Sequence, residues 1–232
     1  MNDAFLDYSY QFNFPDKTSS ELQLKINLQT TTLQSDETTA PYWTALEFNQ
    51  CPNCPFNKEQ HANCPVAQNL IPLLDLSGAL ISYEAVNVII KTPERIISAD
   101  TSIQRAISAL LGLIMATSPC PHTEFLKPMA RFHLPLASEE ETIYRTTSMY
   151  LLAQYFRSKA GFDYEIGFEG LTAVYSNLKI INRALASRFR AASEQDATVN
   201  AIILLDLLSQ AVAWSIEDQL DELQPLFNRF MT

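Results

Sequence analysis

Two stretches near the N-terminus alternate between apolar and polar residues. Aromatic and polar residues alternate in YSYQFNF (residues 8–14), and leucine or isoleucine alternates with polar residues across residues 22–28. The segment PDKTSS between them supplies residues that are typical of turns. A period of two places alternate side chains on one face of a strand. We therefore predict an N-terminal β-hairpin with one buried face.

The next elements are predicted to be a helix and one or two strands. Residues 66–80 are mostly apolar, which indicates a helix that Pro72 kinks or bounds. YEAVNVIIK, residues 83–91, is rich in β-branched residues and is typical of a strand. A further short strand is expected at residues 95–98.

Two helices are predicted in the middle of the chain. Asp100 or Thr101 is expected to cap a helix that runs to Ala116 and ends before two prolines. Ser138 and Glu141 have the spacing of a capping box, which predicts a helix from there to about residue 159.

The C-terminal part continues as helices. Apolar residues recur at spacings of three and four across residues 171–185, which predicts a helix with a narrow apolar seam. Residues 197–214 are apolar on most sides and are expected to form a central helix. A final amphipathic helix is expected from residue 215 or 216 to about 223, and Pro225 breaks it.

These elements predict an α+β fold in a single domain, residues 1–232. The hairpin and the strand near 83–91 would form a small antiparallel β-sheet, packed on a predominantly helical bundle. Residues 1–99 form the β and loop part, and residues 100–232 form the helical part, with no flexible linker between them.

Composition narrows the class of protein. Of the 232 residues, 47% are hydrophobic and 18% are charged, which favours a folded core over disorder. The net charge of −10 disfavours nucleic-acid binding, which draws on clustered Lys and Arg. The most apolar windows are interrupted by Asp75, Glu84 or Asp206, so no membrane span is expected. With no apolar run near its start, the chain is predicted to be a soluble cytoplasmic protein.

Four cysteines carry the strongest chemical pattern in the chain. Cys51, Cys54 and Cys64 lie in CPNCPFNKEQHANCP, Cys120 lies in SPCPHTEF, and proline follows each cysteine. Two cysteines three apart can bind one metal from a single turn, and two more would complete four-thiolate coordination. We therefore predict a zinc site of mainly structural role.

Other interpretations of the cysteines stay open at this point. A [4Fe-4S] cluster also takes four thiolates, and a thiol with a lowered pKa would indicate a redox protein or an enzyme. Four reduced cysteines in a core are a third alternative. Any of His61, His122 and His133 has the chemistry to replace one thiolate. A helical module that binds a protein partner or a second copy is an alternative of another class. Whether the protein has a small-molecule ligand is unknown from the sequence.

Polar residues outside the cysteine pattern have structural and catalytic interpretations. His133 is either a proton shuttle beside Arg131 or a buried histidine bonded to backbone, and its apolar neighbours favour the second. Glu141 and Arg145 have the spacing for a pair on one helix face. Asp206 lies in the apolar run AIILLDLLSQ and needs a partner if it is buried.

The chain resembles an uncharacterised bacterial protein family of unknown function. The likeness is carried by WTALEFNQCPNCP, by CPVAQNL and by LLGLIMATSPCPHTEFLKPMARFHLPLASEEETIYRTTSMYLLAQYF, and it covers nearly the whole chain. The resemblance implies a shared pattern of CPxCP followed by two further CP dipeptides and the motif PMARFHLP. By this resemblance, Cys51, Cys54, Cys64, Cys120, Pro128, Arg131, His133, Glu141 and Arg145 belong to the family motif, and the four cysteines are implied to act together. It implies no activity.

Overall fold

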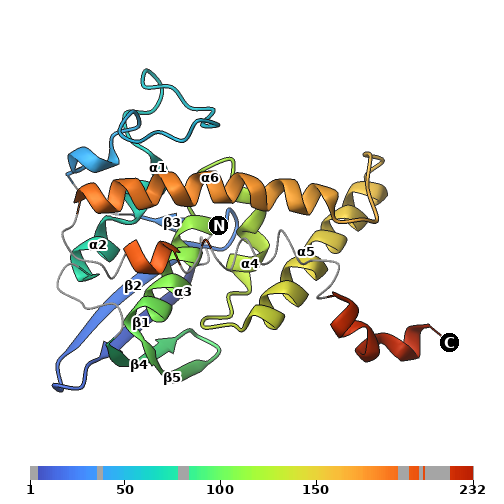
Figure 1. Ribbon diagram of the computed structural model, residues 1–232, viewed down its shortest axis with the longest axis horizontal. Coiled ribbons are helices and arrows are strands. Elements are labelled where there is room, and N and C mark those ends of the chain that lie inside the picture. Colours follow the sequence, from blue (N-terminus) through green and yellow to red (C-terminus); the bar gives the residue numbers. More distant parts are fainter. Residues whose placement is uncertain are drawn as a thin grey trace.

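An antiparallel sheet occupies the N-terminal part of the chain (Figure 1). The computed structural model describes residues 5–35, 39–77, 84–192, 199–203, 206 and 220–231. Within them, a five-stranded sheet has the order β3-β2-β1-β4-β5. Its strands are β1 (Phe5–Asn13), β2 (Ser19–Asn27), β3 (Thr32–Gln34), β4 (Ala85–Lys91) and β5 (Ile96–Ser102).

The central strand β1 has one buried face, as its alternating sequence predicts. It pairs along its whole length with β2 and over its second half with β4, both in the antiparallel sense. Every second residue of β1 is buried: Leu6, Tyr8, Tyr10 and Phe12. The predicted hairpin and the predicted strand near 83–91 are therefore confirmed.

Helices cover the buried face of the sheet and extend beyond it (Figure 1). Helix α3 contacts β4 and β5, and α2 contacts β2. The α-helices are α1 (Pro65–Asn69), α2 (Ile71–Ser77), α3 (Ile103–Ala116), α4 (Lys127–Arg131), α5 (Glu139–Lys159) and α6 (Glu169–Ala192), and the 3-10 helices are η1 (Tyr42–Thr44), η2 (Glu124–Leu126) and η3 (Gln224–Phe230). This arrangement confirms the α+β fold, whereas the single-domain assignment stays a prediction.

Helix α5 begins at the predicted capping box. The Ser138 side chain accepts a hydrogen bond from the backbone N–H of Glu141, and the Glu141 carboxylate accepts one from the backbone N–H of Ser138. Two backbone donors that the first turn leaves unpaired are thereby satisfied.

Helix α3 begins later than predicted. Asp100 and Thr101 do not cap it, because both residues pair with β4 as part of β5. The strand predicted at residues 95–98 therefore extends to Ser102, which is the N-cap residue of α3. The end of α3 at Ala116 agrees with the prediction.

The predicted helices near the C-terminus are only partly described. Residues 199–203 and 206 are helical, and the rest of the predicted central helix lies outside the described residues. Of the predicted final helix, residues 220–223 are described and helical. In the ranges that the structure describes, no helix combines the length and the apolar character needed to cross a membrane.

A buried arginine of α6, Arg188, binds the backbone of residues 43–46, which lead into the cysteine-containing segment 51–64. Arg188 is 2% exposed, and its guanidinium donates to the backbone carbonyl oxygens of Trp43 (2.6 Å), Ala45 (2.8 Å) and Leu46 (3.0 Å). The Trp43 ring also meets the Phe189 ring edge to face. One charged side chain thus satisfies three carbonyl groups at the point where the segment meets the helix.

Replacing Arg188 tests this attachment. We expect Arg188→Ala to lower the free energy of unfolding by about 3 kcal/mol, because it leaves three carbonyl groups without their donor. The control Arg190→Ala removes an exposed arginine of the same helix and should change stability by less than about 0.5 kcal/mol. Urea unfolding followed by circular dichroism measures both, and equal losses would contradict the assignment.

Candidate functional site

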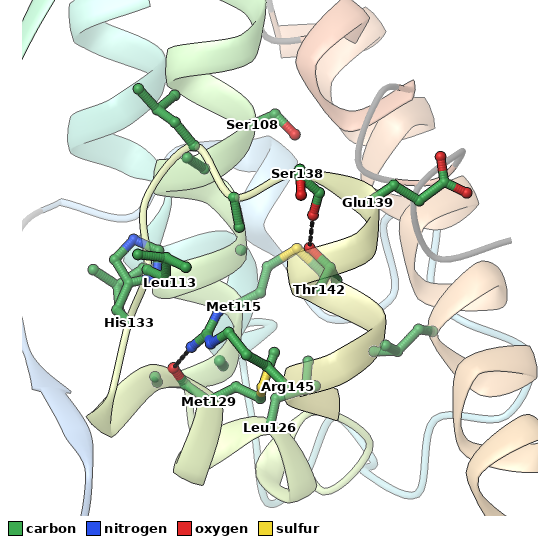
Figure 2. A pocket seen from close by; sticks show the side chains of 18 of the residues that line it. Ser108, Leu113, Met115, Leu126, Met129, His133, Ser138, Glu139, Thr142 and Arg145 are labelled. Carbon is green, nitrogen blue, oxygen red and sulfur yellow. Dashed lines mark hydrogen bonds between the residues drawn. The ribbon is translucent and has the colours of Figure 1, made fainter. Parts of the chain in front are cut away.

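A pocket of about 390 Å³ lies between α3, α4, α5, α6 and the loop that joins α4 to α5 (Figure 2). Most of its lining is apolar, with a few polar groups. The residues that line it include Ala109, Gly112, Leu113, Met115, Ala116, Leu126, Met129, Ala130, His133, Arg145 and Tyr175.

Small residues on α3 leave the space for this pocket. Ala109, Gly112 and Ala116 recur at spacings of three and four, so they lie along one face of the helix, and all three line the pocket. Ala130 on α4 extends the same surface. Larger side chains at these positions would pack against the neighbouring helices. Small residues do not reach that far, so the space beside this face of α3 stays unfilled.

The imidazole of His133 forms part of the pocket wall and is neutral. Its Nε2 and the hydroxyl of Tyr10 on β1 share a hydrogen bond of 2.6 Å. Burial lowers the pKa of His133 to about 3, and the charge of Arg145 acts in the same direction. His133 is half-buried, its ring lines an open pocket, and its partner is a side-chain hydroxyl, so the favoured prediction of a core histidine bonded to backbone is wrong.

Arg145 is the half-buried cation of the pocket. Its Nη2 donates to the carbonyl oxygens of Phe132 (2.6 Å) and Met129 (3.3 Å). Burial lowers the pKa of Arg145, and the nearby charge of Glu141 raises it. Among the described residues the predicted pair of Glu141 and Arg145 is not an ion pair, and the Glu141 carboxylate bonds to the N-cap of α5.

Two buried polar atoms of pocket-lining residues have no hydrogen-bond partner among the residues that the structure describes. They are Oγ of Ser108 and Oδ1 of Asn182, whose residues are 3% and 2% exposed. The side-chain nitrogen of Asn182 donates to Asp206 at 3.3 Å, which supplies the partner that the sequence led us to expect for this carboxylate. Buried polar atoms are usually paired, so two unpaired ones beside one cavity mark a place where a bound molecule has groups to meet.

The four predicted cysteines border a different and much smaller cavity, of about 20 Å³. Cys51 and Cys54 lie in one turn, closed by a 3.0 Å bond from the Cys54 N–H to the Cys51 carbonyl oxygen. Cys64 is the N-cap residue of α1, and Cys120 follows the end of α3. His122 and Arg188 border the same cavity.

The predicted metal centre is wrong. Within the residues that the structure describes, no three His, Cys, Asp or Glu side chains form a group that could hold a metal ion. Zinc and a [4Fe-4S] cluster both need several converging ligands, so the predicted zinc protein and its iron–sulfur alternative fail together. Burial raises the pKa of the Cys51 thiol to about 12 and also raises that of Cys120. Neither thiol has the lowered pKa that a reactive cysteine needs.

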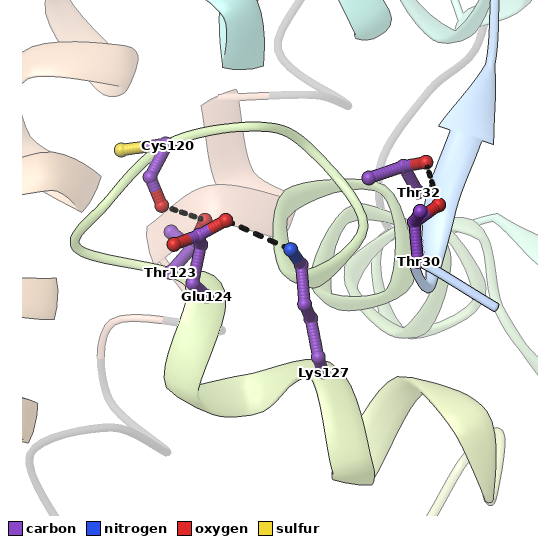
Figure 3. Close-up of polar contacts among 6 residues, drawn as sticks. All are labelled: Thr30, Thr32, Cys120, Thr123, Glu124 and Lys127. Carbon is purple, nitrogen blue, oxygen red and sulfur yellow. Dashed lines mark hydrogen bonds and ion pairs between the residues drawn. The ribbon is translucent and has the colours of Figure 1, made fainter.

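Hydrogen bonds hold the turn at Cys120 (Figure 3). The Cys120 carbonyl oxygen accepts bonds from the backbone N–H and the hydroxyl of Thr123, a fully buried residue. The His122 imidazole bonds to the Asn53 carbonyl oxygen at 2.7 Å and so links this turn to the CPNC turn. An ion pair between Lys127 and Glu124 at 2.8 Å lies next to it along the chain. Ordinary polar contacts therefore bring the two cysteine-bearing segments together.

Sequence reasoning missed the pocket around Arg145. Its signals were present as the spacing of small residues on α3 and as PMARFHLP, which contributes Met129, Ala130, His133 and Leu134 to the wall. Small residues in a helix are also typical of close helix packing, and only the positions of α4, α5 and α6 show that the space stays open.

The neutral state of His133 predicts a dependence of stability on pH. Its folded pKa of about 3 lies below the ordinary value of 6.5, so between these values the unfolded chain binds a proton that the folded chain does not. Stability is therefore lost as the pH falls through this window, by up to about 1.4 kcal/mol per pH unit from this group. We expect His133→Gln to show a shallower loss between pH 6 and 4 in urea unfolding. Parallel pH profiles for the two proteins would contradict a buried neutral imidazole.

Of three comparisons with known proteins, one gives a match. No curated protein matches the sequence, and no solved structure matches it. One family model matches residues 8–228, which is nearly the whole chain. The family is uncharacterised, in agreement with the resemblance seen in the sequence. The chain belongs to the family described as Domain of unknown function (DUF6901).

Proposed function

We propose that this protein binds a small, largely apolar molecule in the pocket between α3, α4, α5 and α6. The observation that carries the proposal is the pocket itself, with about 390 Å³ of space and a mainly apolar lining. Ligand sites in proteins have volumes of roughly 300–1,000 Å³ and combine apolar walls with a few placed polar groups. Arg145, His133 and Ser108 are such groups here.

The fixed positions of the polar groups support binding. The Tyr175 hydroxyl shares a 2.7 Å hydrogen bond with the hydroxyl of Thr146, and Tyr10 holds His133 in the same way. Burial raises the pKa of Tyr175 to about 12, so both ring systems stay neutral over the ordinary pH range. Neutral, oriented groups give a ligand a defined environment before it arrives.

The loop between α4 and α5 supports the proposal because its backbone is held in an uncommon conformation. Leu136 has a positive φ of 60°, which is rare for residues with a side chain. Arg105 donates to the Leu136 carbonyl oxygen at 3.3 Å, and Arg145 donates to that of Phe132 at the other end of the loop. Backbone in such a conformation persists when its surroundings fix it, and it is frequent at ligand sites.

We infer in addition that PMARFHLP is a motif of the family because its residues build this wall. The cysteine pattern is the other inferred motif, with a role in packing the segment 51–64 against α6. Bacterial origin, a cytoplasmic location, the absence of nucleic-acid binding and the existence of a homo-oligomer or protein partner stay predictions.

A cavity-filling variant tests the proposed function. Isothermal titration calorimetry with 1-decanol and with decanoate as probes should show saturable binding of at least one of them to the parent protein. Ala109→Phe should abolish that binding, because the ring occupies the space between α3 and its neighbours, while the protein stays folded. Probe at 100 times its dissociation constant should raise the stability of the parent by about 2.7 kcal/mol.

The matched control is Ala153→Phe, which adds the same ring at an exposed position of α5. This variant should bind the probes as the parent does. Failure of both probes to bind the parent, or full binding by folded Ala109→Phe, would contradict a ligand site at this position.

A further inference from the structure

The pocket contains a cation, Arg145, that the described residues pair only in part. Both hydrogen bonds from Arg145 to described residues use Nη2, which leaves the three N–H groups of Nη1 and Nε for other acceptors. Both bonds end on carbonyl oxygens, which carry no full charge. In the part of the chain that the structure describes, no carboxylate forms an ion pair with Arg145.

A half-buried guanidinium that has no ion pair among the described residues is unfavourable in an apolar cavity, and an anion would lower its free energy. Taking a charge out of water costs free energy unless an opposite charge or enough hydrogen bonds compensate. Hydrogen bonds in which both groups are charged are stronger than neutral ones. A ligand with one negative charge therefore gains more at this position than a neutral molecule of the same shape.

Among the described residues, the other charged groups that line the pocket lie at its edge, and the nearby Glu141 carboxylate accepts a hydrogen bond from the backbone N–H of Ser138. Arg105 is exposed and donates to the Leu136 carbonyl oxygen. Glu139 is exposed, is engaged in another interaction, and extends away from Arg145 in Figure 2. His133 is neutral beside Arg145 and adds no opposing positive charge to compete for the anion.

The remaining wall suits an unbranched apolar chain. Leu113, Met115, Leu126 and Met129 line the pocket together with Arg145 (Figure 2). Methionine side chains adapt to the shape of an apolar partner because they are unbranched and have three rotatable bonds. The small residues of α3 continue this apolar surface along the helix.

We propose that the ligand is a single-chain amphipathic carboxylate, with its carboxylate on Arg145 and its apolar chain along α3. This inference rests on the proposed function, because it assigns the chemistry of a ligand for the same pocket. A carboxylate carries one negative charge, which the half-buried guanidinium of Arg145 balances. A phosphate ester carries about −1.5 to −2 and would leave charge uncompensated.

Four probes with the same ten-carbon chain test the head group on the parent protein. Isothermal titration calorimetry with decanoate, 1-decanol, decylamine and decyl phosphate should rank decanoate first, about 10- to 100-fold tighter than 1-decanol. Octanoate should bind more weakly than decanoate, by roughly fourfold for each CH₂ removed.

The outcomes separate this inference from the proposed function. If 1-decanol or decylamine binds as tightly as decanoate, the pocket is a ligand site but the carboxylate assignment is wrong. If decyl phosphate binds more tightly than decanoate, the head group is wrong. If none of the probes binds, the inference fails together with the proposed function.

Variants of the arginine locate the head group. Arg145→Gln should weaken decanoate at least tenfold and leave 1-decanol within about threefold of the parent, whereas Arg145→Lys should retain part of the preference for decanoate. Arg131→Gln, outside the pocket lining, is the control and should change neither affinity. If Arg145→Gln does not fold, the Lys variant and the probe series on the parent still decide the question. Equal loss of decanoate and 1-decanol in a folded Arg145 variant would overturn the inference.

Discussion

The pocket depends on the two different faces of α3. One face carries Ile103, Ile107, Leu110 and Ile114, which are fully buried and share a core with the inner face of the sheet. The opposite face carries Ala109, Gly112 and Ala116, and these border the pocket. Bulky residues therefore fix the helix on the sheet, and small residues on the opposite face leave space toward the other helices unfilled. The sequence of α3 thus determines both the position of the helix on the sheet and the volume of the pocket beside it.

The sheet also orients the opposite wall of the pocket. Tyr10 on the central strand holds the His133 ring, and the Tyr8 ring meets that imidazole edge to face. Arg105 and Arg145 hold the loop between α4 and α5 through hydrogen bonds to its backbone carbonyl oxygens. A segment without regular structure thus becomes a defined wall, because side chains from the sheet and from two helices hold it. The guanidinium of Arg145, which helps to hold this loop, also faces the pocket.

Local patterns predicted the parts of the fold that depend on local physics. The β1–β2 hairpin follows from alternation, and the start of α5 follows from Ser138 and Glu141, whose contact spans three residues. The predicted start of α3 is wrong because Asp100 and Thr101 pair with β4. This pairing joins segments apart in the sequence, so the local pattern around the two residues does not show it.

The candidate site could not be predicted, for the same physical reason. Its space arises between elements far apart in the chain, and no single stretch contains it. The prediction of a metal site at the cysteines is wrong because ordinary hydrogen-bonded turns have the same cysteine spacing and the same following prolines as metal-binding turns. In this protein the buried guanidinium of Arg188 and the imidazole of His122 organise that region.

Methyl NMR gives the most direct test of the claim that ligands enter the pocket between α3 and α5. In protein labelled with ¹³C at the methionine methyl groups, titration with decanoate should shift the signals of Met115 and Met129, which line the pocket. Met149 and Met231 lie outside that lining and should keep their positions. Unchanged signals for Met115 and Met129 at saturating decanoate, or shifts confined to the exposed Met231, would contradict the account.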